Sequence, residues 1–184
     1  MATVILTGFM GTGKTAVGQR LAERTGATFL DTDAMVERTE ACSIDRIFAE
    51  HGEPYFRAAE RRAVAQAVTN TDAVIATGGG AIVDDENYRR LHAAGPIVCL
   101  SADPETIVGR TRRGEARPLL AGRDALERVR DLLAARAAAY AKADLTIDTS
   151  SLAVDEVVDR ILEFLQSTPS AKRSERSDPH HRIH

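Results

Sequence analysis

The feature that most constrains the fold is a glycine-rich loop close to the start of the chain. Residues 8–15 read Gly8-Phe9-Met10-Gly11-Thr12-Gly13-Lys14-Thr15, a full match to the pattern G-x-x-x-x-G-K-[ST]. The apolar run Val4-Ile5-Leu6 precedes this loop and a helical pattern follows it, which is the strand–loop–helix context that a phosphate-binding loop requires. The loop therefore predicts an α/β protein that binds a nucleoside triphosphate.

The residue types in the loop fit this chemistry. Glycines let consecutive backbone N–H groups turn toward an anion, and the following helix directs its positive end to the same point. We expect Lys14 to reach the β- and γ-phosphates of ATP, and the Thr15 hydroxyl to bind Mg²⁺. The residues expected to surround the phosphates are Gly11, Thr12, Gly13, Lys14, Thr15 and Ala16.

Short apolar runs alternate with longer segments of helical periodicity along the chain. The runs are Thr3–Thr7, Thr28–Leu30, Ala73–Ala76, Ile97–Leu100 and Leu145–Ile147. Because they are continuously apolar instead of alternating with polar residues, they favour a parallel sheet that is covered on both faces. The expected fold is α/β, a three-layer sandwich with a five-stranded parallel sheet and helices on both faces.

The helical segments are predicted from periodicity and from the residues that stop helices. One helix follows the loop and ends at Gly26. Residues 33–66 indicate helical segments that break at His51-Gly52-Glu53-Pro54, and two further helices are expected at 126–143 and 154–165.

Length and local composition predict one domain with two unusual segments. We expect residues 1–166 to form a single domain, since 184 residues with 43% hydrophobic content suit one core. Residues 112–124 are basic, glycine-bounded and weakly periodic, which is typical of a mobile lid. Residues 167–184 are rich in serine, proline and charge, so we expect a disordered tail.

Charge and apolar patterning limit the partners. The formal net charge is −3, so no general basic field for nucleic acid or anionic membrane is expected. We find no apolar run long enough to cross a bilayer and no signal-peptide pattern, which predicts a cytoplasmic protein. Cys42 and Cys99 lack metal-site spacing and are expected to be free thiols. A monomer is expected.

Two acids follow the second predicted strand, at Asp31 and Asp33. In an open parallel sheet, ligands bind beyond the carboxyl ends of the strands, so these acids can face the phosphates. We expect Asp31 to hold Mg²⁺ through a water molecule, and Asp33 to face a second substrate. The alternative is that Asp33 only caps the next helix.

Three consecutive glycines, Gly78-Gly79-Gly80, follow the third predicted strand. Glycines at this edge of the sheet permit close approach to a ligand and leave N–H groups available to it. A tight turn into a helix is the alternative.

Taken in order, these motifs resemble those of the shikimate kinase family. The resemblance covers residues 1–166, and its elements are the loop at 8–15, Asp31-Thr32-Asp33, Phe56-Arg57 with Glu60, Gly78-Gly79-Gly80, Arg117-Pro118-Leu119-Leu120 and Arg136. It implies a P-loop kinase with a mobile lid that transfers the γ-phosphoryl group of ATP to the 3-hydroxyl of shikimate, a step in aromatic amino acid biosynthesis.

The resemblance also implies roles for individual residues. Its substrate-binding segment corresponds to residues 33–61. Arginine forks suit the shikimate carboxylate, and Asp33 is placed to polarise or deprotonate the hydroxyl. The residues implied to bind shikimate are Asp33, Arg57, Gly78, Gly79, Gly80 and Arg136.

On the nucleotide side, the resemblance implies that Lys14 and Arg117 stabilise charge on the transferring phosphoryl group, with Arg117 carried by the lid. Lys14, Asp33 and Arg117 form the implied catalytic set, and Arg110 is implied to stack on adenine. From charge pattern alone, a solvated loop for Arg117 and the polar face of a helix for Arg136 are the favoured interpretations, and the resemblance reverses that preference.

Two other functions remain alternatives. A gluconate-type kinase has a similar loop, but the histidine typical of that family after the second acid is absent, because Ala34-Met35 stand there. A nucleotide-binding regulator without transfer activity is the other alternative, and the presence of acceptor and lid residues together argues against it.

Overall fold

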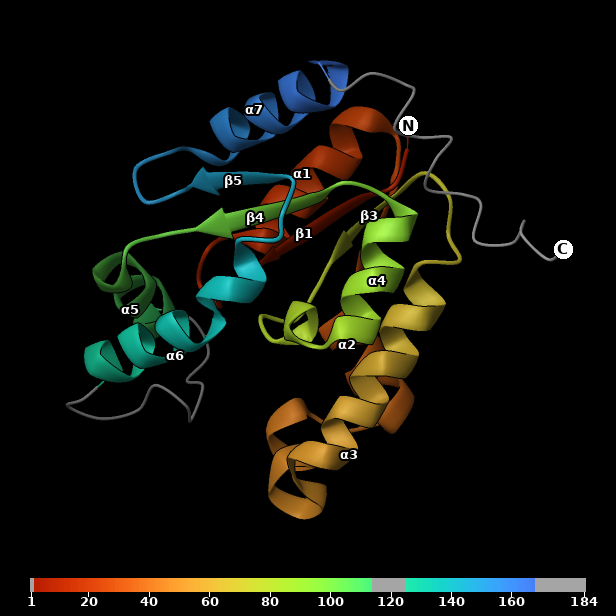
Figure 1. Ribbon diagram of the computed structural model, residues 1–184, viewed down its shortest axis with the longest axis vertical. Coiled ribbons are helices and arrows are strands. Elements are labelled where there is room, and N and C mark those ends of the chain that lie inside the picture. Colours follow the sequence, from red (N-terminus) through yellow and green to blue (C-terminus); the bar gives the residue numbers. More distant parts are fainter. Residues whose placement is uncertain (1, 114–124, 168–184) are drawn as a thin grey trace, which may run out of the picture.

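The chain forms an α/β fold, seen here in a computed structural model that describes residues 2–113 and 125–167 (Figure 1). All strand pairs are parallel, in the order β2-β3-β1-β4-β5. The strands are β1 (Val4–Gly8), β2 (Thr28–Asp31), β3 (Ala73–Ala76), β4 (Ile97–Ser101) and β5 (Leu145–Asp148). Each lies within one residue of its predicted bounds, so the predicted five-stranded parallel sheet is confirmed.

Helices cover both faces of this sheet. They are α1 (Lys14–Thr25), α2 (Thr32–Glu40), α3 (Ile44–Ala67), α4 (Asp85–Ala94), α5 (Pro104–Arg113), α6 (Ala125–Tyr140) and α7 (Val154–Ser167), with a 3₁₀ turn at Ala81–Val83. Side chains such as Ile5 and Ile75 pack against α2, α3 and α4, whereas Leu6 and Val98 pack against α1 and α7. Successive strand residues thus bury apolar side chains on opposite faces, and the predicted three-layer sandwich is confirmed.

A smaller apolar cluster lies beyond the sheet, where α5 and α6 pack together. Phe9 from the phosphate-binding loop is 1% exposed and packs there with Ile107 and Val129. The loop is therefore anchored by its own side chain to the two helices that flank residues 114–124.

Helix boundaries show where the sequence prediction was correct and where it was incomplete. Gly26 ends α1 in the left-handed conformation, with φ 69°, as predicted. The predicted break at 51–54 is confirmed at Gly52, which has φ 77° within α3. The predicted helical region 33–66 contains a second break, because Ala41 adopts φ 54° at the end of α2 and the Ser43 hydroxyl caps α3.

Parts of the predicted lid and tail fall outside the residues that the structure describes. The predicted lid begins in the last two residues of α5, and residues 114–124 lie outside the description. Helix α7 continues to Ser167, so the predicted tail boundary was wrong by one residue, and residues 168–184 lie outside the description. No helix in the described ranges is long and apolar enough to cross a membrane.

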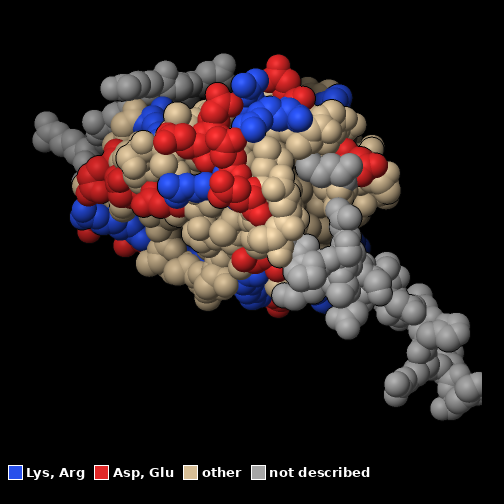
Figure 2. All heavy atoms as spheres, turned by 90° about the horizontal axis from the view of Figure 1, so that it is seen from above, with Lys and Arg blue, Asp and Glu red and all other residues tan. Residues whose placement is uncertain are grey.

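Surface charges of both signs are interspersed on the face that Figure 2 shows. Ion pairs link α1 to α7, with 2.7 Å between Arg20 and Asp155 and 2.7 Å between Arg24 and Asp159. Exposed pairs of this kind contribute little to stability, so the apolar contacts of α1 and α7 hold this layer in place.

Candidate active site

The phosphate-binding loop joins β1 to α1 at the carboxyl end of the sheet. Gly8, Gly11 and Gly13 have φ values of 132°, 76° and 93°, which residues with a Cβ rarely adopt. Gly13 is the N-cap of α1, so the loop leads directly into the helix amino terminus, where anions are favoured. The predicted strand–loop–helix context is confirmed.

The Lys14 side chain folds back over this loop. Its Nζ atom donates hydrogen bonds to the carbonyl oxygens of Gly8, at 2.8 Å, and Phe9, at 2.9 Å. The Thr12 hydroxyl donates to the same Phe9 oxygen at 2.7 Å. The ammonium group is therefore positioned at the loop by the backbone before any phosphate binds. Thr15 and Ala16 are exposed in the first turn of α1.

Asp31 connects the loop to α2. Its Oδ2 atom accepts a hydrogen bond from the Thr15 hydroxyl at 3.3 Å, and its Oδ1 atom accepts from the backbone N–H groups of Asp33 and Ala34 at 3.0 and 3.2 Å. Asp31 is thus the N-cap of α2. The alternative in which Asp33 is the cap is wrong, because Asp31 occupies that position.

The Thr15 hydroxyl and the Asp31 carboxylate are a suitable oxygen donor set for Mg²⁺. This ion is usually held by one or two protein oxygens together with substrate phosphates and water. The described residues contain no group of three or more His, Cys, Asp or Glu side chains that could hold a metal. The fit is therefore to a nucleotide-bound Mg²⁺, and a metal centre built by the protein alone is not found in this part of the chain.

The three glycines after β3 make room for functional side chains. A Cβ atom added to Gly78 would lie 2.5 Å from Oδ1 of Asp33, and one added to Gly79 would lie 3.2 Å from Nη1 of Arg136. None of the three glycines adopts the left-handed conformation. Glycine is needed at these positions because a larger residue would collide with neighbouring side chains. The groups that approach this backbone closely in the structure are therefore the protein's own side chains.

Gly80 makes the same kind of contact with Arg57. A Cβ atom at Gly80 would lie 2.8 and 3.0 Å from the two Nη atoms of Arg57, and 3.3 Å from Cζ. The nitrogens are nearer than the carbon, so the added atom would lie near the outer end of the guanidinium group. Any side chain at Gly80 would therefore displace the Arg57 fork.

Two carboxylates hold Arg57 in this position. Its Nη1 atom donates to Glu60 at 2.8 Å, and its Nε and Nη2 atoms donate to one oxygen of Glu53 at 3.2 and 3.1 Å. The Glu60 side chain is only 2% exposed, and burial raises the pKa of its carboxyl group although Arg57 opposes the rise. Burial disfavours the charge on Arg57, but Glu60 and Glu53 outweigh it, and the pKa of Arg57 is raised.

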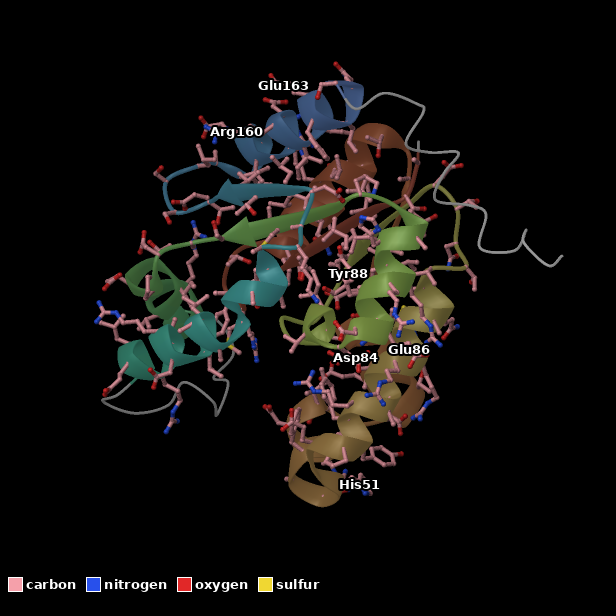
Figure 3. All side chains as sticks on the ribbon, viewed as in Figure 1. His51, Asp84, Glu86, Tyr88, Arg160 and Glu163 are labelled. Carbon is pink, nitrogen blue, oxygen red and sulfur yellow. The ribbon has the colours of Figure 1, made fainter. Side chains whose placement is uncertain are left out.

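A pocket of about 380 Å³ opens between α3 and α6 beside this arginine. Figure 3 labels Asp84, which lies at the beginning of α4 and borders the pocket. The pocket is lined by Glu53, Arg57, Gly80, Val83, Asp84, Ala135 and Arg136. Two arginines and a glycine backbone in one small pocket suit a ligand that carries a carboxylate.

Arg136 reaches the site from α6. Its guanidinium group lies over the Phe9 ring, 5.3 Å from the ring centre, and next to Gly79. Since Phe9 belongs to the phosphate-binding loop, Arg136 contacts both the loop and the pocket. A position on the solvated polar face of its helix, the alternative for Arg136, would not give these contacts with Phe9 and Gly79.

Arg110, on α5, contacts the phosphate-binding loop. It donates to the carbonyl oxygen of Gly11 at 3.3 Å, and to the hydroxyl and carbonyl oxygens of Thr149 at 3.1 and 2.7 Å. These bonds fasten α5 to the loop and to the segment after β5. Contact between Arg110 and adenine stays a prediction.

The structure brings the predicted site residues together at one edge of the sheet, apart from Arg117, which lies outside the described residues. Sequence reasoning did not assign site roles to Glu53, Phe9 or Tyr140. A signal for two of them was present, because Glu53 precedes Arg57 by four residues and Tyr140 follows Arg136 by four, which places each pair on one helix face.

The comparisons with known proteins cover most of the chain. The family described as shikimate kinase matches residues 10–166. A shikimate kinase of Desulforudis audaxviator is 46% identical over 166 residues, which are 90% of this chain and 87% of that protein. A shikimate kinase of Geobacter metallireducens is 45% identical over 163 residues, covering 89% of this chain and 91% of that protein.

Solved structures give the same result in three dimensions. A shikimate kinase from Acinetobacter baumannii, determined in complex with shikimate, matches with a TM-score of 0.86 at 37% identity. The match covers 91% of this chain and 94% of that chain. The similarity is therefore not confined to the phosphate-binding loop, which many unrelated enzymes contain.

Proposed function

The chain belongs to the shikimate kinase family, and from that premise we propose how its residues divide the work. The reaction transfers the γ-phosphoryl group of ATP to the 3-hydroxyl of shikimate and gives ADP and shikimate 3-phosphate. The hydroxyl oxygen bonds to the γ-phosphorus, the bond from that phosphorus to the β,γ-bridging oxygen breaks, and the hydroxyl proton is released.

In the acceptor half of the site, Arg57 and Arg136 bind the carboxylate of shikimate and so orient the ring. Both line one pocket together with Gly80, and charge-assisted bonds from arginine forks give strength and direction. The backbone of Gly78, Gly79 and Gly80 completes this half. Asp33, beside Gly78, accepts the proton of the 3-hydroxyl or orients that group for attack.

In the nucleotide half, the loop from Gly11 to Ala16 surrounds the phosphates with backbone N–H groups. Lys14 stabilises the charge that develops on the transferring phosphoryl group, and Arg110 contributes to the nucleotide site. We assign Arg117 to the same charge, brought by a lid over 112–124 that excludes water. Thr15 and Asp31 hold Mg²⁺, which neutralises phosphate charge when it is bound.

The observation that supports these assignments is that a different side chain lies in the space beside each glycine. A Cβ atom would come close to Asp33 at Gly78, to Arg136 at Gly79 and to Arg57 at Gly80. One short backbone segment thus aligns a proton acceptor with two carboxylate-binding groups beside the phosphate-binding loop. We further propose that the protein is cytoplasmic and that it acts as a monomer. Size-exclusion chromatography with light scattering will test the monomeric state.

A coupled ADP-release assay tests the function. We expect ADP release that depends on shikimate, with none above background for gluconate or for no acceptor. Turnover of gluconate without turnover of shikimate would overturn the assignment. Saturable shikimate binding by calorimetry, without any shikimate 3-phosphate formed, would indicate a regulator instead.

The Gly80→Ala variant tests the packing of the glycine segment. The added methyl group meets the far end of the Arg57 side chain, so the arginine shifts while the fold is retained. A misplaced binding group is costly, and we expect the KM for shikimate to rise by about 10- to 100-fold, with the KM for ATP unchanged.

The matched control for this variant is Gly109→Ala, where an added Cβ atom meets nothing within 4 Å. It is expected to retain the parent kinetics. If Gly80→Ala also keeps the parent KM for shikimate, the proposed contact between this glycine and the binding fork of Arg57 has no functional role.

A further inference from the structure

Tyr140 contacts the glycine segment of the proposed acceptor site but does not line the acceptor pocket. It is the last residue of α6, and its hydroxyl donates a hydrogen bond of 2.7 Å to the carbonyl oxygen of Gly79. A Cβ atom added to Gly79 would lie 3.5 Å from this hydroxyl and 3.2 Å from Nη1 of Arg136. Two side chains from successive turns of one helix thus lie beside the same glycine, and Tyr140 is hydrogen-bonded to it.

The hydrogen bond sets the direction of a peptide group in the site. The described residues contain no cis peptide bond, and in a trans peptide the carbonyl and the next N–H point in opposite directions. Tyr140 therefore directs the carbonyl of Gly79 toward itself and the N–H of Gly80 away. Gly80 lines the acceptor pocket, whereas Tyr140 lines a separate cavity of about 260 Å³ with Phe9 and Cys99.

The phenol is a reliable donor in this position. Burial raises the pKa of Tyr140, although Arg136 partly opposes the rise. The hydroxyl therefore stays protonated through the neutral range and keeps its bond to Gly79. Arg136 lies over the Phe9 ring of the phosphate-binding loop and also interacts with the Tyr140 hydroxyl, so both residues limit where its guanidinium group can lie.

We propose that Tyr140 is a positioning residue for the acceptor, which acts by orienting the Gly79–Gly80 peptide and by confining Arg136. Gly80 N–H and Arg136 are then presented together to the carboxylate of shikimate. This inference rests on the proposed function, because it concerns the same acceptor pocket. Tyr140 itself does not touch the reacting atoms and is not a catalytic residue.

The Tyr140→Phe variant removes only the hydroxyl group. We expect the KM and the calorimetric Kd for shikimate to rise roughly five- to tenfold, the effect of losing one buried hydrogen bond. The KM for ATP, the kcat at saturating shikimate and the midpoint of thermal unfolding should stay close to those of the parent. A selective change in acceptor binding is the signature of positioning.

Tyr88→Phe provides the matched control. Tyr88 lies on α4 (Figure 3), and its hydroxyl also donates to a backbone carbonyl, that of Lys142, at 3.5 Å. This variant should keep the parent KM for shikimate. If both variants behave alike, or if Tyr140→Phe weakens both substrates together with a lower unfolding midpoint, the positioning role is refuted and the hydroxyl is structural.

A test of the Tyr140 role can fail without the proposed function failing, and the two results are distinguishable. Absence of shikimate turnover in the parent chain overturns the function itself. Turnover in the parent with an unchanged KM and Kd for shikimate in Tyr140→Phe overturns only the role of Tyr140.

Discussion

Replacement of Asp33 by asparagine is expected to lower the kcat for shikimate phosphorylation by about 10²- to 10⁴-fold, the range for loss of a positioned proton acceptor. Asparagine has nearly the same size, so it fits beside Gly78, where a Cβ atom would already lie 2.5 Å from the carboxylate. Because Asp31 caps α2, the helix keeps its cap in the variant. The loss should therefore appear in turnover and not in folding.

The measurement is steady-state kinetics over a range of pH, with thermal unfolding in parallel. Asp85→Asn, at an exposed carboxylate that pairs with Lys142 at 3.0 Å, is the control and should retain full activity. A decrease in kcat of less than threefold for Asp33→Asn would show that the loose transition state needs no proton acceptor. A higher Kd for shikimate with unchanged kcat would limit Asp33 to binding.

Most of the fold could be predicted because buried parallel strands leave a clear signal. Continuous apolar runs such as Ile97–Leu100 have one interpretation when helical segments separate them. The break at Ala41 had no such signal, since alanine favours helices, yet Ala41 adopts φ 54° at the end of α2. Local propensity was overridden there by tertiary structure.

The residues of the site could be predicted by type, but their mutual contacts could not. A G-K-T loop is recognisable from its sequence as a phosphate-binding element, and two acids after a strand are recognisable as candidates to bind Mg²⁺ or a substrate. The sequence did not reveal that Asp31, rather than Asp33, caps α2, because both acids suit the position. The spacing of Glu53, Arg57 and Glu60 on one helix allowed these contacts, but it did not reveal that both carboxylates pair with Arg57 at the same time.

The glycine segment illustrates the same limit. From sequence, Gly78-Gly79-Gly80 allows either an unusual backbone conformation or close packing. Only the three-dimensional arrangement decides for packing, because the side chains that need the space come from α2, α3 and α6. Each glycine is required because of a side chain that is far away in the sequence but adjacent in the fold.

Replacement of Lys14 by methionine is expected to lower kcat by about 10²- to 10³-fold or more, the effect of losing a preorganised charge at a transferring phosphoryl group. In the structure the Lys14 ammonium donates hydrogen bonds to the carbonyl oxygens of Gly8 and Phe9, which position its charge at the phosphate-binding loop. Methionine is unbranched and only one heavy atom shorter than lysine, and it carries no charge. ATP affinity should fall as well, since the phosphates lose a cation.

Lys142→Met is the matched control, because Lys142 is also a partly exposed lysine held by a local contact, here with Asp85 at 3.0 Å. It should keep the parent kcat and KM. Single-turnover measurements at saturating ATP separate the two effects in Lys14→Met: a slow chemical step supports charge stabilisation in the transition state. A normal chemical step with only a raised Kd for ATP would reduce Lys14 to a binding residue, and the charge on the phosphoryl group would then have to be stabilised by other groups of the site.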